Sequence, residues 1–462
     1  MKSKALTTPK KIDAPKKKAE STRAALIKSV IADYEDRKLK RRNLELQWRL
    51  NLDFYSGKQN SMVTAFDTIA NISKQFAWQR NESFNHIVSL MESRMSRITT
   101  HRIELQPQPE TDGEGTGASV DLCKKLLNSA FEKNQFERLR EQATMWSEVT
   151  GTAFYKVSWN EKRGKTIGII NDGKDEQQIR EGDIVVSIHS PFEIYPDNMG
   201  ASDVFELGSL IHAQNGVIER YEAASEKYPN GRLTIVEGEK LLYDGELPYI
   251  NQKDGVRGIP FVRQTSESFV GSFFGRSVIE RLIPVQRAYN AVKNRKVEFL
   301  NRLACGILVA EEGSVDFEAL ENDGLAPGKV IVYRQGSTAP KFLETGEIPA
   351  ELEREEERLL AEFESIGGGG DVIRNFTERA PSGTALAILV EQDARRMKRV
   401  MQSVEWATCA VAAQILRLYK QFAANKRLEK MVSAKGVELF DFDGNAITCD
   451  SVTIVEGEQL NG

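Results

Sequence analysis

The feature that most constrains the fold is one long amphipathic segment near the C-terminus, over residues 384–425. Its apolar residues recur three or four positions apart, as on one face of an α-helix; they include Met397, Val400, Val404, Val411, Ile415, Leu418 and Phe422. A helix of about forty residues spans ~60 Å at 1.5 Å per residue, longer than most helices of globular domains. The pattern therefore predicts a strut between layers of the molecule.

Two further helical segments carry opposite charges and flank a short insert. Residues 276–304 hold seven basic residues against two glutamates, whereas residues 347–366 hold eight glutamates against two arginines. We expect these helices to pair, within one chain or between neighbouring copies, through charged residues that include Arg287, Lys293, Arg295 and Lys296 of the first and Glu351, Glu355 and Glu356 of the second. Because exposed ion pairs contribute only ~0–1 kcal/mol each, such pairing sets orientation and register more than stability.

Proline and turn residues predict where these elements begin and end. Pro284 is expected to open the first charged helix, since proline suits the first helical position and kinks a helix interior. Residues 305–346, between the charged helices, are expected to form short strands with turn-rich connections.

The remaining residues predict an α+β fold. Residues 25–150 have helical periodicity, and the runs "TAFYKVSWN", "GDIVVSIHS" and "RLTIVEG" predict an antiparallel sheet over about 150–262 that packs on those helices. Residues 1–24 are rich in lysine and proline and poor in large apolar groups, so we expect a disordered basic arm. Residues 426–462 are expected to form a C-terminal β segment, a hairpin with its turn around Asp443 and Gly444.

Composition and motifs argue against an enzyme or a metalloprotein. The four cysteines have no CxxC spacing, and "GLAPGKV" is one residue short of a phosphate-binding loop and lacks its hydroxyl residue. His189 and His212 have no acidic or cysteine partner at a ligand spacing, so we expect a structural role for both. We therefore expect no catalytic residue, no metal and no cofactor. With no export signal and no long apolar run, we expect a protein made in a cytoplasm, with no membrane partner.

Four consecutive glycines, Gly367, Gly368, Gly369 and Gly370, and a Pro-Ser-Gly turn precede the long helix. With this loop, the order of segments resembles that of the portal proteins of tailed bacteriophages. The resemblance is strongest in "GSFFGRSVIERLIPVQRAYN" at 271–290, similar to the family's GxSxIExLxPxQxxYN region, and in "SGTALAIL" at 382–389, similar to the start of its long helix. Weaker similarities are "FYSGKQN" at 54–60, "VTGTAFYKVSW" at 149–159 and "SPFEIYPD" at 190–197. Asn60 departs from the family, which often has an aromatic residue there.

The resemblance implies a role for each segment. Residues 25–275 would be the wing, 276–304 and 347–366 the two stem helices, and 305–346 the clip. Residues 367–383 would be the tunnel loop, and 384–425 a long helix toward a small crown. The implied assembly is a dodecameric ring at a single capsid vertex of the virion. Its implied partners are double-stranded DNA, a terminase, the major capsid and scaffolding proteins, and head-tail adaptor proteins.

The glycines allow two interpretations. Glycine adopts positive and negative φ at little steric cost, so a loop that lines a channel can adapt to DNA that slides past. In that case Arg374, Asn375 and Arg379 would contact phosphates without reading bases, since sequence-specific contacts would stall transport. Alternatively, the glycines only connect two helices. Two other classes of protein also remain open, a ring-forming virion adaptor or capsid protein and an enzyme that acts on nucleic acid.

Overall fold

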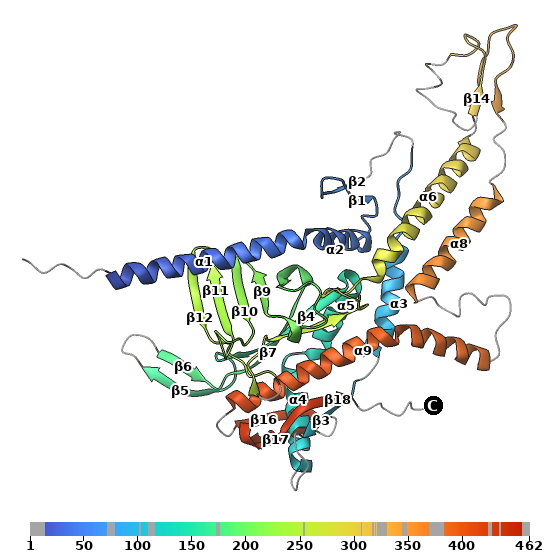
Figure 1. Ribbon diagram of the computed structural model, residues 1–462. Helices are drawn as coiled ribbons and strands as arrows, with labels where there is room; N and C mark the ends of the chain where they lie inside the picture. The colour runs from blue at the N-terminus through green and yellow to red at the C-terminus, as the bar shows by residue number, and fades with distance from the viewer. Residues whose placement is uncertain are drawn as a thin grey trace, which may run out of the picture.

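The protein consists of a body of helices and antiparallel sheets and a two-helix projection that ends in a small β tip, as the computed structural model shows (Figure 1). The structure describes residues 14–71, 79–100, 103–109, 116–171, 176–252, 255–305, 307–316, 318, 320, 330–343, 349–368, 383–423, 427–433 and 436–454. This mixture of helices and sheets confirms the α+β class.

Two antiparallel sheets form the centre of the body. Their strand orders are β13-β4-β7 and β12-β11-β10-β9-β8. The strands are β4 (Thr152–Asn160), β7 (Asp183–His189), β8 (Ile194–Pro196), β9 (Ser209–Gln214), β10 (Val217–Glu222), β11 (Arg232–Glu237), β12 (Lys240–Gly245) and β13 (Phe261–Thr265). A single turn of 3-10 helix, η1 (Pro191–Glu193), leads from the first sheet into the second. The three runs that predict an antiparallel sheet correspond to the antiparallel strands β4, β7 and β11, but these strands lie in two sheets and not in one.

Helix α1 (Ala14–Lys40) lies along the five-stranded sheet, and α2 (Arg42–Tyr55) follows it toward the base of the projection (Figure 1). Between them, Arg41 is only 1% exposed and donates hydrogen bonds to the carbonyls of Pro191 (2.7 Å) and Phe192 (2.8 Å). The predicted disorder of residues 1–24 is wrong from Ala14 onward. Lysine, alanine and glutamate are good helix formers, and they extend a helix whose later turns are docked on the sheet. Residues 1–13 lie outside the described residues.

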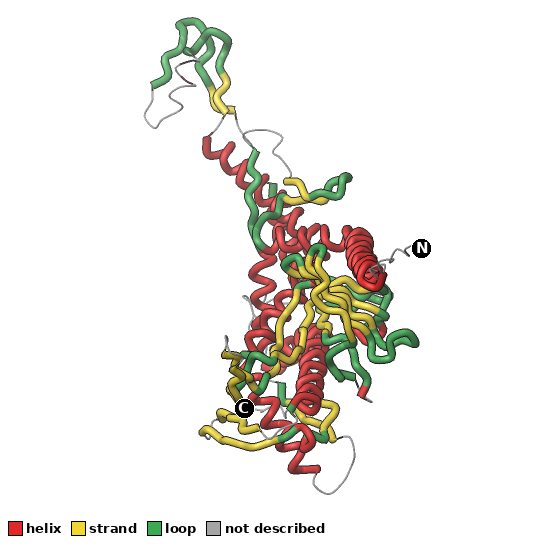
Figure 2. The backbone as a smooth tube through the Cα atoms, turned by 90° about the vertical axis from the view of Figure 1, so that its left-hand side faces the viewer, coloured by secondary structure: helices red, strands yellow, loops and turns green. Residues whose placement is uncertain are grey.

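Helices α3 (His86–Thr100), α4 (Thr116–Lys133), α5 (Phe136–Thr150) and α9 (Gly383–Phe422) complete the body (Figure 2). The largest core packs α4, α5 and α9 against the three-stranded sheet. The predicted long helix is confirmed as α9. Of its apolar face, Met397, Val400, Val404, Val411, Ile415 and Leu418 are buried, and Phe422 is half-buried.

The projection consists of α6 (Val278–Cys305), the paired strands β14 (Ile307–Val309) and β15 (Lys341–Leu343), and α8 (Ala350–Gly367) (Figure 1). Pro284 lies inside α6, so the prediction that it opens this helix is wrong. Its neighbours Ile283 and Val285 are buried in the core, whereas Pro284 itself is exposed. Burial of the flanking side chains thus outweighs the lost backbone hydrogen bond. Within the described residues, no helix is both long enough and apolar enough to cross a membrane.

The remaining strands form four two-stranded sheets. They are β1 (Ser61–Val63) with β2 (Ile69–Asn71), β5 (Thr166–Asn171) with β6 (Glu176–Arg180), β16 (Arg427–Ser433) with β17 (Gly436–Phe442), and β18 (Cys449–Ile454) with β3 (Leu105–Pro109). The predicted C-terminal hairpin with its turn at Asp443 and Gly444 is therefore wrong. The chain around Gly444 forms the 3-10 turn η5 (Gly444–Ala446), and the strands on its two sides pair with different partners.

Candidate functional site

The two charged helices pack along a shared apolar seam at the base of the projection. Val278, Leu282 and Tyr289 of α6 are at most 4% exposed and lie in one cluster with Leu359 and Phe363 of α8. The same cluster includes residues of α2 and α3, so the base of the projection is fixed to the body.

One glutamate of α8 binds two lysines of α6. The Glu356 carboxylate accepts a hydrogen bond from Lys293 Nζ and lies 3.2 Å from Lys296 Nζ. Lys296 Nζ also lies 3.4 Å from the carboxylate of Glu353. Burial would raise the pKa of Glu356, but the hydrogen bonds from the two lysines outweigh it and hold this pKa below its ordinary value. The structure therefore shows that the two charged helices pair within one chain.

The other predicted stem residues have different surroundings. Arg287 donates to the Ser61 carbonyl (2.8 Å) and lies over the Phe54 ring, at 5.2 Å from its centre. Glu355 pairs with its own helix, through Arg358 at 3.4 Å. Arg295 and Glu351 are exposed and have no ion pair with any described residue. The structure therefore joins Lys293, Lys296 and Glu356 and leaves the other four predicted residues apart from them.

The first two glycines of the run end α8 against the body. A Cβ atom on Gly367 would stand 2.2 Å from Cδ2 of Leu90 in α3, closer than atoms can approach. Gly368 has a φ of +64° and donates its backbone N–H to the Glu364 carbonyl (3.1 Å), the left-handed conformation that glycine favours at a helix C-terminus. Gly367 and Gly368 thus have specific structural reasons to be glycine, close packing and helix termination.

A buried ion pair anchors this helix end. Arg94 of α3 donates to the Gly367 carbonyl, and its Nε lies 2.6 Å from a carboxylate oxygen of Glu148 in α5. The second oxygen of Glu148 accepts from Ser266 Oγ at 2.5 Å. Because both charged side chains are buried, each needs the other, and removal of one would leave an unpaired buried charge. The sequence offered no signal for this network, because its members come from distant segments.

A cleft of about 1290 Å³ opens beside the end of α8, between the segment after β13 and the face of α9. Several arginines line it, and an exposed tryptophan, Trp406, lies among them. The arginines are Arg94, Arg263, Arg281, Arg395 and Arg399. Arginines in a cleft can bind anionic groups or the acidic surface of another chain.

The other predicted residues of the tunnel loop cannot be placed. Gly369, Gly370, Arg374, Asn375 and Arg379 lie outside the described residues. The described chain ends at Gly368 in the cleft and resumes at Gly383, the first residue of α9.

His189 and His212 also differ from the prediction, which gave them no acidic partner. His189 Nδ1 lies 2.7 Å from Glu193 Oε2, and His212 Nδ1 lies 2.8 Å from Glu219 Oε2. Burial would raise the pKa of both carboxyls, but hydrogen bonds with the histidines outweigh it and lower each pKa to about 2. Both contacts have a local signal in the sequence: the four-residue spacing of His189 and Glu193, and the Asn215-Gly216 hairpin turn, which brings Glu219 opposite His212.

Comparison with known proteins identifies the family. No curated protein matches the chain. The family model described as phage P22-like portal protein matches residues 203–446, which is more than half of the 462 residues. The matched range runs from the five-stranded sheet through α6, the β14–β15 tip, α8, the glycine run and α9 to the end of η5. The chain therefore belongs to the family of P22-like phage portal proteins.

Proposed function

We propose that copies of this chain form a ring, with twelve subunits expected, at a unique vertex of the phage capsid. Genomic DNA enters the capsid through the ring during packaging and leaves through it on ejection. The observation that carries this proposal is the family match, because it spans both charged helices, the small tip between them and the glycine run. The chain acts as a structural component of the virion and not as an enzyme.

The architecture supports one role for each part. Residues 25–275, which form most of the body, serve as the wing, and the paired helices α6 and α8 serve as the stem. The β14–β15 tip lies at the far end of the stem and serves as the clip, where terminase docks during packaging and head-tail adaptors dock afterwards (Figure 1). The wing faces the capsid interior, with the major capsid and scaffolding proteins as its partners.

The proposed tunnel loop starts from a fixed point. Gly367 and Gly368 hold the end of α8 on α3, so the segment that adapts to moving DNA begins after Gly368. Arg374, Asn375 and Arg379 contact DNA phosphates within this segment, without base recognition.

Electron microscopy of the purified chain tests the ring. We expect rings with an axial hole. Rings without a hole would favour another virion adaptor, a chain that stays monomeric at every concentration would refute the portal function, and magnesium-dependent nicking of plasmid DNA would favour an enzyme.

A deletion of residues 370–377 tests the loop, because it spares both anchoring glycines. We expect intact rings and a lower yield of packaged DNA in an in vitro packaging assay. A variant of full loop length, with Arg374 and Arg379 replaced by glutamine, separates the role of charge from that of length. Loss of rings in the deletion variant, or packaging at the wild-type level, would contradict the assignment.

A further inference from the structure

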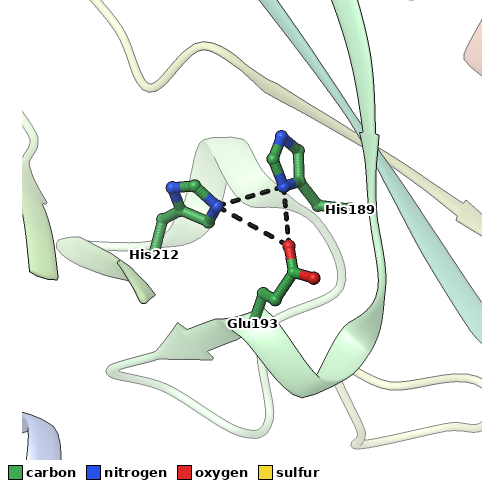
Figure 3. A group of neighbouring side chains, drawn as sticks. All are labelled: His189, Glu193 and His212. Atoms are coloured by element: carbon green, nitrogen blue, oxygen red, sulfur yellow. Dashed lines mark hydrogen bonds and ion pairs between the residues drawn. The ribbon is translucent and has the colours of Figure 1, made fainter. Parts of the chain in front are cut away.

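Two histidines and a glutamate meet where the two central sheets join. His189 ends β7 of the three-stranded sheet, Glu193 ends η1, and His212 lies in β9 of the five-stranded sheet. Both histidines are buried, at 6% and 4% exposure. Figure 3 shows that the three side chains point toward one another from these separate elements.

The three facing atoms have nearly the spacing of metal ligands. His189 Nδ1 lies 3.0 Å from His212 Nε2 and 2.7 Å from Glu193 Oε2, and His212 Nε2 lies 3.8 Å from the same oxygen. Ligand atoms at tetrahedral positions about 2.0–2.1 Å from Zn²⁺ are roughly 3.3 Å apart. Shifts of about half an ångström would bring all three atoms to these positions.

The outer nitrogen of each histidine already has a partner that fixes its orientation. His212 Nδ1 lies 2.8 Å from Glu219 Oε2, and His189 Nε2 lies 2.9 Å from Ser187 Oγ. If each outer nitrogen carries the proton, Nε2 of His212 and Nδ1 of His189 present lone pairs to the centre. A carboxylate behind a ligand histidine is a regular feature of zinc sites. Glu219 is itself held by Lys156 Nζ (2.6 Å) and the Tyr221 hydroxyl (2.8 Å).

No placement of protons on the two histidines joins all three facing atoms to one another by hydrogen bonds. A proton on His189 Nδ1 can point at Glu193 or at His212, but not at both. A proton on His212 Nε2 that points at His189 leaves a lone pair of His189 against the Glu193 carboxylate at 2.7 Å. A single cation would contact all three atoms at once.

We propose that His189 Nδ1, His212 Nε2 and a carboxylate oxygen of Glu193 bind one Zn²⁺ ion that ties the two central sheets together. Two imidazoles and one carboxylate favour zinc over magnesium or calcium, which prefer sets of oxygen ligands. The Glu193 side chain is 27% exposed, which gives the ion a path from solvent and leaves a fourth position for water. The site lies at the junction of the two central sheets and not in the projection, so its role is structural.

Zinc titration of the full-length chain, without a histidine tag, tests the site. We expect the wild-type chain to retain one zinc ion after dialysis and to melt at a higher temperature with added ZnCl₂. Glu193→Gln, which removes a partly exposed ligand, and His212→Gln should abolish both effects. Glu219→Gln, which removes only the support behind His212, should weaken zinc binding by about 10- to 100-fold.

Matched controls separate this site from incidental zinc binding. His86 and Glu206 lie on other elements, so His86→Gln and Glu206→Gln should bind zinc as the wild type does. Cobalt(II), used as a probe, should give the visible absorption of a tetrahedral site in the wild type and both controls, but not in Glu193→Gln. Circular dichroism checks that Glu193→Gln and His212→Gln remain folded.

A folded wild-type chain that binds no zinc would overturn the proposal. Zinc binding that survives unchanged in a folded Glu193→Gln variant would also overturn it, because the ion would then lie elsewhere. If His212→Gln does not fold, Glu193→Gln and Glu219→Gln still decide the question. Ring formation is measured separately, so failure of this proposal and failure of the portal function are distinguishable.

Discussion

Replacing Gly367 with alanine should loosen the end of α8 and leave the rest of the chain intact. The added Cβ would lie 2.2, 2.8 and 3.0 Å from Cδ2, Cδ1 and Cγ of Leu90. The Leu90 side chain cannot escape by turning its tip alone, because Cγ is also too close. Leu90 is only 8% exposed, so it has little space to move into.

The expected cost follows from two opposing effects. Overpacking of a filled site costs about 1–3 kcal/mol, and alanine recovers at most about 1 kcal/mol of helix propensity. Because the added Cβ contacts three atoms of one side chain, we expect an overpacking cost in the upper part of this range of about 1–3 kcal/mol. The end of α8 should therefore lose about 1–2 kcal/mol of stability. This loss corresponds to a roughly 5- to 30-fold larger population of the open form.

Hydrogen exchange measures this local opening in a chain too large for a two-state analysis. Backbone amides in the last turn of α8 should exchange roughly 5- to 30-fold faster in Gly367→Ala. Gly117 of α4 is the matched control, because a Cβ at this helical glycine would meet no neighbouring atom within 4 Å. Gly117→Ala should therefore leave exchange in α8 unchanged. Wild-type exchange rates in Gly367→Ala would refute the close approach of α8 to Leu90.

Three further predictions concern other contacts. In a double-mutant cycle of Lys293→Gln and Glu356→Gln, we expect a coupling energy of about 0.2–1 kcal/mol that falls at high salt, measured from hydrogen exchange of the amides of α6 and α8. The folded state lowers the pKa of Glu356, so the ionised carboxylate stabilises the fold above its ordinary pKa of 4.5. This stabilisation is lost as the pH falls through the lower pKa of the folded state. Glu356→Gln should therefore remove this part of the pH dependence of the melting temperature. Arg41→Met removes the donor to the carbonyls of Pro191 and Phe192, so it should cost about 1–3 kcal/mol and lower the melting temperature measured by calorimetry. An unchanged melting temperature would contradict these hydrogen bonds.

Local patterns predicted the helices and strands whose stability depends on one apolar face. The spacing from Met397 to Phe422 gave α9, and the run from Thr152 to Asn160 gave the whole of β4. Such faces are visible in the sequence because their residues recur at the period of the element.

Two of the failed predictions depend on partners distant in the sequence. A turn between β17 and β18 looked like a hairpin, but β18 pairs with β3, more than 300 residues earlier. Pro284 looked like a helix start, but buried neighbours on both sides keep it inside α6. These two contacts leave no local pattern, so the sequence alone could not predict them. Glu219 differs, because the Asn215-Gly216 turn between β9 and β10 is a local hairpin signal that predicts its pairing with His212.

The charge pairs within the projection limit what can hold neighbouring subunits together in the proposed ring. Glu356 already binds Lys293 and Lys296 of its own chain, which leaves exposed charges such as Arg295 and Glu351 for a neighbouring copy. Exposed ion pairs contribute little free energy each, so these charges can orient two subunits but not hold them. Near its C-terminal end, α6 exposes Leu300 (44%) and Leu303 (37%). Burial of apolar surface is the stronger driving force, so we expect contacts between subunits along the stem to depend mainly on such apolar residues, with the free charges setting the register.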